Sequence, residues 1–258
     1  MKVVACAKVV PDPARPARLD PVTHRLARDA KLVLDEADTY GVEVALQLVA
    51  QAGEGEVVVV SMGPDDGSAL RPALAMGAAG AVVVRDEALA GSDALATAKV
   101  LAAAIGRVGA DVVVAATESS DGYTGTMPAQ LAELLGLPSV TFCRRVSLEG
   151  GRLRAERQTE GGFDEVACPL PALITVTAGC VEPRYPSYKG IMGARSKPVE
   201  VLTVADLGLA AGAVGQAGAR QEVVSVTPTA GRGAGEMVTD ASVAHVFIVE
   251  LLERLKVV

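Results

Sequence analysis

Short runs of β-branched apolar residues alternate, in the first half of the chain, with segments whose apolar residues recur at helical spacing. Helices are expected around Ala37–Val49 and Ala94–Ile105, and a third from Ser68 to Met76 with Gly77 near its C-cap. Ser92 is the expected N-cap of the helix that follows it. Four apolar runs are predicted strands: Lys2–Ala7, Glu56–Met62, Ala81–Val84 and Asp111–Ala116. This alternation predicts an α/β fold built on a parallel sheet.

The pattern changes after Gly136. Ser139–Leu148 and Arg152–Gln158 flank a Glu-Gly-Gly turn and predict an antiparallel β-hairpin inserted into the fold. Phe163–Ala167 is a candidate third antiparallel strand. The apolar run Pro169–Val176 is expected to return a buried strand to the main sheet.

Two parts are expected along the chain, an α/β domain over residues 1–207 and a C-terminal arm over residues 208–258. The arm begins with a Gly- and Ala-rich stretch to Ala219 that is typical of a linker. Glu222–Thr227 is a candidate extended segment, and Ala241–Lys256 has helical spacing. Composition leaves two alternatives open for this terminal helix, which either packs on a partner subunit or folds back on its own domain.

Composition and charge exclude several classes of function. Half of the 258 residues are hydrophobic, but no apolar run approaches the ~20 residues of a membrane span, and the N-terminus is typical of a first strand, so a cytoplasmic location is expected. The net charge of −7 argues against a nucleic-acid surface. Four cysteines without CxxC spacing and only two histidines make a structural zinc site or histidine-based catalysis improbable.

A loop of small hydroxyl and glycine residues, from Thr117 to Met127, joins the strand Asp111–Ala116 to the next expected helix. A strand, such a loop and a helix N-terminus together form the geometry that binds phosphate, because free N–H groups and the helix dipole favour an anion. The alternative is an ordinary loop whose Ser, Thr and Asp side chains only cap the helix. No common nucleotide motif decides between them.

A proline-broken polar segment, Glu182–Met192, follows the last buried strand and is typical of a functional surface loop. Taken with other motifs in the same order, it makes the chain resemble the β subunits of electron transfer flavoproteins from Met1 to about Leu207. The C-terminal region matches this family more loosely, through Thr227–Gly235. The other matching motifs are Ser61–Pro64, Ala73–Ala78, Thr117–Pro128, Arg157–Val166 and Pro171–Val176.

The resemblance implies an adenine-nucleotide-binding (Rossmann-like) α/β domain in a heterodimer with an α subunit. Such proteins carry electrons from flavoprotein dehydrogenases, with an FAD held mainly by the α subunit and closed over by the β subunit. The β subunit also holds a structural AMP, whereas electron-bifurcating members hold a second FAD there. The chain is therefore expected to be an electron carrier without catalytic side chains of its own.

The resemblance also implies which residues bind nucleotide and which meet the dehydrogenase. By position, Tyr188 corresponds to the side chain that anchors docking, although a tyrosine lying on its own domain is the alternative. The docking positions are Glu182, Pro183, Arg184, Tyr185, Tyr188, Lys189, Ile191 and Met192. The nucleotide positions are Cys6, Asp35, Asp38, Met62, Asp121, Gly122, Tyr123, Thr124, Gly125, Thr126 and Met127.

Three departures from the family's patterns bear on the nucleotide. Asp35-Glu-Ala-Asp replaces the family's Asn-Pro-x-x, and Ala37 stands where some members have an aromatic residue near the flavin. The loop is Ser-Ser-Asp-Gly-Tyr-Thr-Gly, whereas bifurcating members tend to have Ala-Ile-Asp-Gly-Asp. These differences favour AMP over a second FAD.

Two other classes of protein compete with this interpretation. A stand-alone nucleotide hydrolase or ligase of this fold is expected to show a Ser-Gly-Gly-x-Asp-Ser-like loop or clustered metal-binding acids, and neither is present. A stand-alone adenine-nucleotide-binding module of the stress-protein type has no use for the Glu182–Met192 loop or for the arm. A neighbouring gene for a flavin-binding α subunit separates these alternatives from the first.

Overall fold

The structure, a computed structural model, describes residues 1–227, 235 and 237–257. The described residues divide into two compact units, Met1–Val223 and Val224–Val258, and each is described by itself. Most of the Thr227–Gly235 motif lies outside the described residues. Among the described residues, no helix is both long and apolar enough to cross a membrane.

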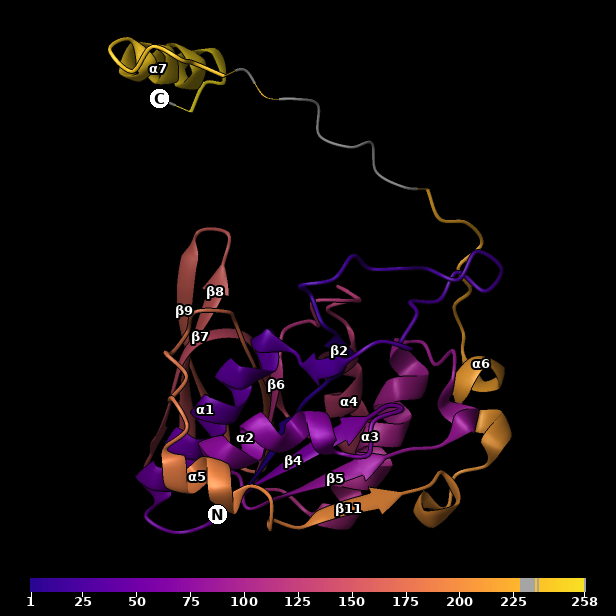
Figure 1. The fold of residues 1–258 in the computed structure, drawn as a ribbon. Coiled ribbons are helices and arrows are strands. Elements are labelled where there is room, and N and C mark those ends of the chain that lie inside the picture. Colours follow the sequence, from indigo (N-terminus) through magenta and orange to yellow (C-terminus); the bar gives the residue numbers. More distant parts are fainter. Residues whose placement is uncertain (228–234, 236, 258) are drawn as a thin grey trace. The chain divides into compact units, whose positions relative to one another are not determined.

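A nine-stranded sheet organises the first unit (Figure 1). Seven neighbouring strands, from β11 to β7, are parallel, whereas β8 and β9 continue the sheet in antiparallel pairing. The predicted parallel sheet with an antiparallel hairpin insertion is therefore confirmed. In order across the sheet, the strands are β11 (Val199–Leu202), β5 (Gly80–Val84), β4 (Glu56–Met62), β1 (Lys2–Cys6), β6 (Val112–Ala116), β10 (Ala172–Val176), β7 (Ser139–Glu149), β8 (Arg152–Thr159) and β9 (Gly162–Pro169).

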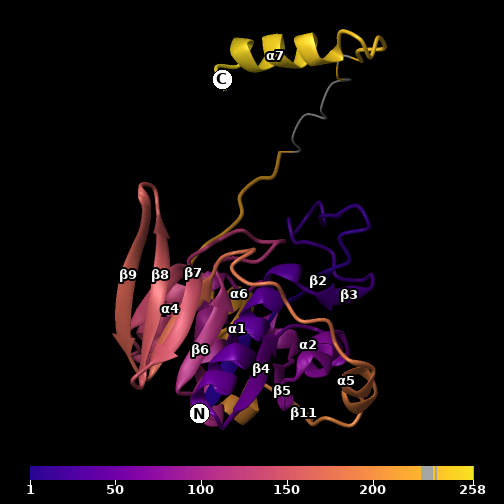
Figure 2. The ribbon, with the colours of Figure 1, turned by 90° about the vertical axis from the view of Figure 1, so that its left-hand side faces the viewer.

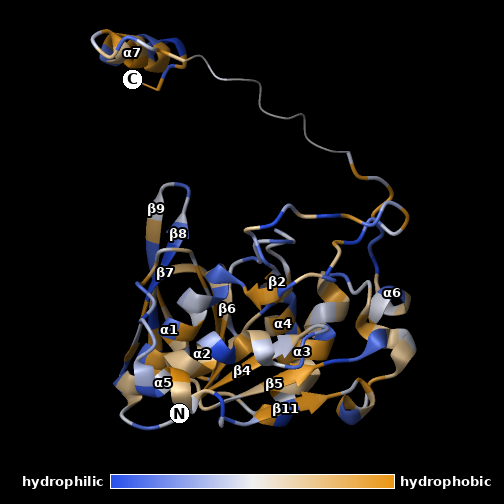
Figure 3. Ribbon diagram, viewed as in Figure 1, coloured by the Kyte–Doolittle hydropathy of each residue, from blue (hydrophilic) through white to orange (hydrophobic). Residues whose placement is uncertain are grey.

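Helices cover both faces of the parallel strands, as strands buried on both sides require (Figures 1 and 2). One face carries α1 (Glu36–Ala52) and α2 (Arg71–Met76), which follows a 3₁₀ turn at Ser68–Leu70, with α5 (Tyr188–Gly193) packed on α2. The other face carries α3 (Ala94–Val108) and α4 (Met127–Leu135). Hydropathy follows the same layers, because the central strands are apolar along most of their length (Figure 3).

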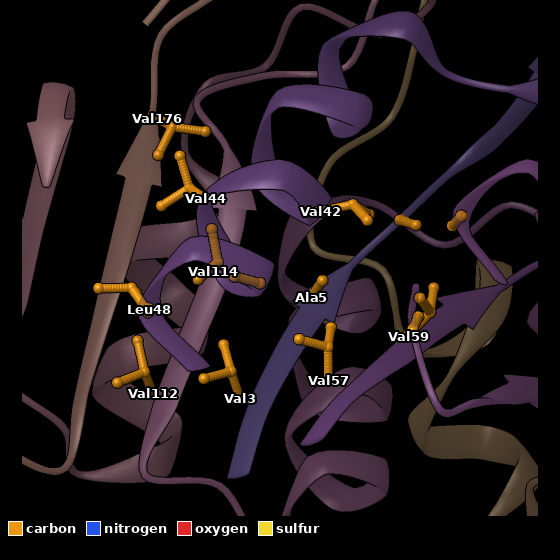
Figure 4. Close-up of a cluster of buried hydrophobic side chains, with 14 of the residues drawn as sticks. Val3, Ala5, Val42, Val44, Leu48, Val57, Val59, Val112, Val114 and Val176 are labelled. Carbon is orange, nitrogen blue, oxygen red and sulfur yellow. The ribbon is translucent and has the colours of Figure 1, made fainter. Parts of the chain in front are cut away.

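The core beneath α1 is built from valines at alternate positions of the strands. Val3 and Ala5 from β1, and Val112 and Val114 from β6, are buried against Val42, Val44 and Leu48 of the helix (Figure 4). Small β-branched side chains bring the helix close to the sheet. Gly41 continues this approach, since a Cβ built there would lie 3.6 Å from a Val114 methyl group. The position of α1 over β1 and β6 is therefore fixed by close packing.

The N-cap of α3 differs from the expectation. Asp93, not Ser92, caps the helix, because its carboxylate accepts the Ala96 N–H at 2.8 Å. Ser92 instead donates its hydroxyl to the Leu89 carbonyl at 2.8 Å and accepts the Gly215 N–H at 3.1 Å. The prediction was wrong by one residue. Both side chains can cap a helix, but the serine is engaged in hydrogen bonds with neighbouring loops.

The Gly- and Ala-rich stretch after Leu207 packs against the loop that precedes α3. It therefore differs from the linker that its composition predicts. It forms 3₁₀ turns at Ala205–Leu207 and Ala211–Ala213 and the short helix α6 (Gly215–Gly218). Val214 is fully buried, and the Gln216 N–H donates to the Ala90 carbonyl at 2.9 Å. Packing of residues 208–258 on a partner subunit stays a prediction.

The described part of the second unit contains one helix, α7 (Ala244–Arg254), within the predicted span Ala241–Lys256. Residues Glu222–Thr227, around the start of this unit, form no regular strand. None of the residues of α7 is buried, and apolar side chains of the helix and its flanks are exposed. Exposed apolar side chains grouped in this way are typical of an interaction surface. They include Val243, Val246, Ile248, Val249 and Leu255.

Candidate functional site

The carboxyl ends of β1 and β6 lie side by side in the parallel sheet, and the residues that follow them form one charged cluster. Lys8 comes two residues after β1, and the loop from Thr117 to Thr126 comes directly after β6. A third chain segment reaches the cluster through Arg28. This residue lies in the connection between two short strands that pair antiparallel, β2 (Val9–Pro11) and β3 (Leu32–Leu34). Ligands of open α/β sheets bind at this edge of the sheet.

The loop after β6 is held in an unusual backbone conformation. Tyr123 has a φ of 47° and Gly125 a φ of 62°, and the Tyr123 N–H donates to the Ser119 carbonyl at 3.0 Å. Left-handed backbone is costly for a tyrosine, and such residues cluster at functional sites. Gly122 permits close approach, because a Cβ there would lie 3.1 Å from the Ser119 hydroxyl and 3.5 Å from Lys8 Nζ.

Helix α4 begins at the end of this loop without a side-chain cap. Thr126 holds the N-cap position but its side chain makes no capping hydrogen bond, and Pro128 stands in the first turn. The first N–H groups of a helix have no partner within the helix, so an uncapped start offers donors and a positive dipole end to an anion. The alternative that the side chain of Thr126 caps the helix is therefore not supported by this geometry.

Asp121 gathers two cations within the loop. Lys8 Nζ donates to Asp121 Oδ1 at 2.5 Å and to the Ser119 hydroxyl at 3.0 Å, while Arg28 pairs with Asp121 Oδ2. Only 8% of the Asp121 side chain is exposed. Burial by itself raises the pKa of this carboxyl, but the hydrogen bond and charge of Lys8 and the charge of Arg28 outweigh burial and lower it. Asp121 is thus an ionised group between two cations.

Asp35 ties the loop to α1. It is the N-cap of the helix and is fully buried, and its carboxylate accepts the Ala37 N–H at 3.2 Å and the Ser120 N–H at 2.8 Å. Its own N–H donates to the Lys8 carbonyl at 2.9 Å. One side chain therefore holds together the start of α1, the loop after β6 and the chain after β1.

Asp38 and Cys6 lie beneath the cluster. Asp38 Oδ2 accepts the Lys8 N–H at 2.6 Å. Burial, with the nearby charges of Asp35 and Asp121, raises the pKa of Asp38 to about 8 although Lys8 opposes the shift. Burial and then the charge of Asp38 raise the pKa of the Cys6 thiol to about 12. Both shifts favour the neutral form of the group, so Asp38 opposes an incoming anion less than an ordinary carboxylate would.

The structure brings together most of the predicted nucleotide positions, but not all. Asp35, Asp38, Cys6 and the loop from Asp121 to Met127 share one cluster. Met62, at the carboxyl end of β4, packs in the apolar layer on the α3 side. Tyr123 points away from the core with 68% of its surface exposed. Whether these residues bind a nucleotide stays a prediction.

Sequence reasoning missed two cations, Lys8 and Arg28. Lys8 carried a weak signal, since a charged residue just after a buried strand marks the edge where sites form. Arg28 carried none, because it lies 93 residues from the carboxylate that it pairs with. The groups of acidic, histidine and cysteine side chains in the described residues contain no metal-binding arrangement.

The predicted docking segment, residues 182–192, exposes two aromatic rings. Tyr185 is 96% and Tyr188 81% exposed, and Ile191 and Met192 are half exposed beside them. Ser187 caps the short helix α5, because its hydroxyl accepts the Gly190 N–H at 3.1 Å. Ordered, exposed and apolar, this surface has the character of an interaction site.

Arg184, one of the predicted docking positions, is paired within the chain. Its guanidinium makes a two-pronged ion pair with Glu43 of α1, with Nε 2.7 Å from Oε2 and Nη2 3.0 Å from Oε1. The charge of Arg184 is thereby compensated. Lys189, the other basic residue of the segment, makes no ion pair with any residue that the structure describes.

A Rossmann-like sheet with an anion-binding geometry at its carboxyl edge and an exposed apolar segment beyond it defines a class of α/β carrier and binding proteins. Comparisons with known proteins narrow this class. The electron transfer flavoprotein domain matches residues 23–207. The chain belongs to the electron transfer flavoprotein family, and along nearly its whole length it is similar to β subunits of that family.

Three relatives show the extent of this similarity. The electron transfer flavoprotein subunit beta of Mycobacterium tuberculosis is 41% identical over 263 aligned residues, covering 99% of each chain. The subunit beta of Thermoanaerobacterium thermosaccharolyticum is 38% identical, covering 93% of this chain and 92% of the relative. Subunit CarD of the caffeyl-CoA reductase-Etf complex of Acetobacterium woodii is 36% identical, covering 95% of each. Membership of this family supports a role in electron transfer.

Proposed function

We propose that this chain pairs with a flavin-binding α subunit, receives electrons from flavoprotein dehydrogenases and holds AMP at the carboxyl edge of its sheet. The observation that carries the nucleotide proposal is the uncapped start of α4 at the end of a loop whose Asp121 pairs with Lys8 and Arg28. An FAD shared with the α subunit supplies the redox chemistry when bound. This chain's residues bind and position nucleotide and partners, and no side chain of its own takes part in bond making.

The two cations of the cluster suit a phosphate monoester. Lys8 and Arg28 both pair with the Asp121 carboxylate, and the raised pKa of Asp38 favours its neutral form. Phosphate oxygens accept hydrogen bonds from backbone N–H groups at a helix start and from lysine and arginine together. The donor set therefore fits the phosphate of AMP, with Ser119, Ser120, Thr124 and Thr126 as further hydroxyl donors.

Replacing Gly125 by valine tests the nucleotide site. Gly125 has a φ of 62°, which valine adopts only with strain, and a Cβ there would lie 3.5 Å from Glu118 Oε2. We expect nucleotide released from the denatured heterodimer to fall to about a tenth or less of the parent amount. Chromatography of the released nucleotides measures this and identifies them.

Gly136→Val is the matched control for Gly125→Val. Gly136 ends the same helix with a φ of 66°, and its Cβ would meet nothing within 4 Å. It imposes similar backbone strain away from the loop and is expected to leave the nucleotide in place. Full nucleotide content in Gly125→Val, or equal loss in both variants, contradicts the assignment of the loop.

The same chromatography separates AMP from a second FAD. One AMP and one FAD per heterodimer support the proposal. Two FAD molecules and no AMP support the bifurcating alternative instead.

The exposed apolar residues of α7 support pairing with an α subunit over a stand-alone nucleotide-binding module. Obligate interfaces commonly bury ~2,000 Å² or more and are apolar. Deleting residues 224–258 removes the second unit while leaving the first unit, Met1–Val223, complete. We expect the deletion to abolish copurification with the α subunit without unfolding the first unit, as circular dichroism reports. A truncated chain that still retains the α subunit at full strength rejects this role of the arm.

A further inference from the structure

Glu43 is a charged residue in the middle of α1, on a side of the helix that the chain around Arg184 covers. Only 5% of its side chain is exposed, and its neighbours on the helix, Val42 and Val44, are buried. Burying a carboxylate is unfavourable unless its charge and its oxygens are fully satisfied. An apolar residue would pack in this position without that cost, so the charge calls for another explanation.

Glu43 is satisfied almost entirely by the start of the docking segment. Arg184 donates to it through Nε at 2.7 Å, through NH2 at 3.0 Å and through its main-chain N–H at 3.1 Å. Gln47, one turn further along α1, donates to Oε1 at 2.9 Å. Burial raises the pKa of Glu43, but the hydrogen bonds from Arg184 and Gln47 outweigh it and hold the pKa below its ordinary value.

The geometry of this pair specifies position as well as charge. A planar guanidinium that meets a carboxylate through two parallel hydrogen bonds admits one relative orientation, and the third bond fixes the main chain itself. The 44% exposure of the Arg184 side chain shows that water can reach the pair from the arginine side only, since Glu43 is enclosed. The start of the docking segment is thus held in a fixed position on α1.

Two further contacts hold the rest of the segment on α2. Gly190 lies so close to that helix that a Cβ would fall 2.4 Å from the Ala75 carbonyl oxygen. Lys197 Nζ donates to the carbonyls of Leu74 and Ala78 at 2.8 Å and 2.6 Å, at the end of the helix. Between Arg184 and Gly190 along the chain, Tyr185 and Tyr188 expose their rings to solvent. The segment is therefore rigidly supported where it presents its aromatic residues.

We infer that Glu43 is a positioning residue for partner docking, which acts through Arg184 to fix the start of the segment that presents Tyr188. This inference rests on the proposed docking of a dehydrogenase at residues 182–192. A preorganised loop loses less conformational freedom on binding, so its affinity falls when its support is removed. The effect belongs to encounter and complex formation, and not to the flavin or to the nucleotide site.

The experiment uses the holo heterodimer as electron acceptor for an acyl-CoA dehydrogenase kept reduced by its acyl-CoA substrate. Glu43→Gln keeps the side-chain volume but removes the charge. We expect the KM for the heterodimer to rise about tenfold while kcat changes less than about twofold. Direct reduction by dithionite and the nucleotide content are expected to stay at parent values.

Hydrogen exchange adds a readout that does not depend on the dehydrogenase. In Glu43→Gln, the amides of residues 183–193 are expected to exchange faster, whereas those of residues 119–130 are expected to be unchanged. Arg184→Met is expected to raise KM in the same direction, and the double variant to behave like the Glu43→Gln variant alone, because both changes break one interaction. Glu36→Gln, an exposed glutamate in the first turn of the same helix, is the matched control.

The outcomes separate this inference from the docking proposal. If Tyr188→Ala raises KM and Glu43→Gln does not, Glu43 has no positioning role and docking at the segment stands. If neither variant changes KM, both the docking proposal and this inference are overturned. If Glu43→Gln lowers nucleotide content and dithionite reduction together with coupling, Glu43 supports the fold in general and the inference is wrong.

Discussion

The charged cluster at the carboxyl edge of the sheet and the docking segment are both held by α1, but they differ in solvent exposure. In the cluster, Asp121 is enclosed, with 8% of its side chain exposed, and each charge has a partner inside the chain. In the docking segment, Tyr185 and Tyr188 are 96% and 81% exposed while the charges behind them are paired. This difference fits the proposed functions, in which the first region holds a nucleotide and the second meets a partner briefly. In both regions, paired charges fix the positions of the chain segments. The regions differ in the exposure of their side chains, which suits them to different binding partners.

The largest effect expected from breaking this contrast is in the cluster. Lys8→Met leaves the Asp121 carboxylate with Arg28 as its one cation and removes a charged donor from the proposed phosphate site. A hydrogen bond to a charged group contributes about 1.5–3 kcal/mol, and the Asp121 carboxylate, left with one cation instead of two, adds repulsion, so nucleotide affinity is expected to fall about 100-fold. Isothermal titration of nucleotide into the stripped heterodimer measures it.

Lys31→Met is the control for the change at Lys8. Lys31 lies in the same N-terminal region but is 68% exposed and pairs with Asp12 at 3.5 Å. It is expected to leave nucleotide affinity unchanged, and electron acceptance from the dehydrogenase is expected to be parental in both variants when nucleotide is saturating. Unchanged affinity in Lys8→Met removes Lys8 from the site.

A smaller effect is expected in the docking segment. Loss of a buried aromatic anchor at an interface typically costs ~2 kcal/mol or more, so Tyr188→Ala is expected to slow electron acceptance from the acyl-CoA dehydrogenase by about an order of magnitude. Bound flavin and AMP are expected to stay as in the parent. Stopped-flow reduction at sub-saturating heterodimer measures the rate.

Tyr185→Ala compares the two exposed rings directly. If its rate falls as far as that of Tyr188→Ala, the interface has no single anchor at Tyr188. If Tyr188→Ala instead loses nucleotide while the rate of reduction stays at the parent value, the two regions do not have the separate functions proposed above.

The smallest effect concerns the pH dependence of stability. Asp38 has a folded-state pKa of about 8, above the ordinary value near 4 of an unfolded chain, so the folded state binds its proton more tightly. The stabilisation is complete below about pH 4 and is lost as pH rises toward 8, with a slope of at most about 1.4 kcal/mol per pH unit from this group. Asp38→Asn, whose amide oxygen can still accept the Lys8 N–H, is expected to flatten that slope. Urea unfolding between pH 5 and 8.5 measures it, and parallel curves for the two proteins contradict the assignment.

Periodicity along the chain predicted the fold well because each element has a local signature. Valine runs in β1, β4 and β6 are buried on both faces, and the Glu-Gly-Gly turn joins two strands that pair as expected. The Gly- and Ala-rich stretch did not follow its composition, because small residues fit closely against the loop before α3. A Cβ at Gly215 would lie 1.9 Å from the Ala88 carbonyl oxygen, so glycine there marks a tight contact and not a linker.

The candidate site was less predictable because its bonds join distant positions. The loop after β6 has a sequence signature, and it was found. The partner of Asp121 at Arg28 lies 93 residues away, and the partner of Glu43 at Arg184 lies 141 residues away. Glu43 is typical of a solvent-facing helix position until the structure shows that the face is covered. Charge pairs of this kind depend on tertiary packing, which hydrophobic spacing does not encode.

The four cysteines have a consequence for durability. Burial raises the pKa of every one of these thiols, to about 12 for Cys6 and Cys143, so the protonated thiol is the favoured form at pH 7. Peroxide attacks the thiolate, not the thiol. We therefore expect the cysteines of this chain to resist oxidation, and Cys180 to resist it least because it is only partly buried.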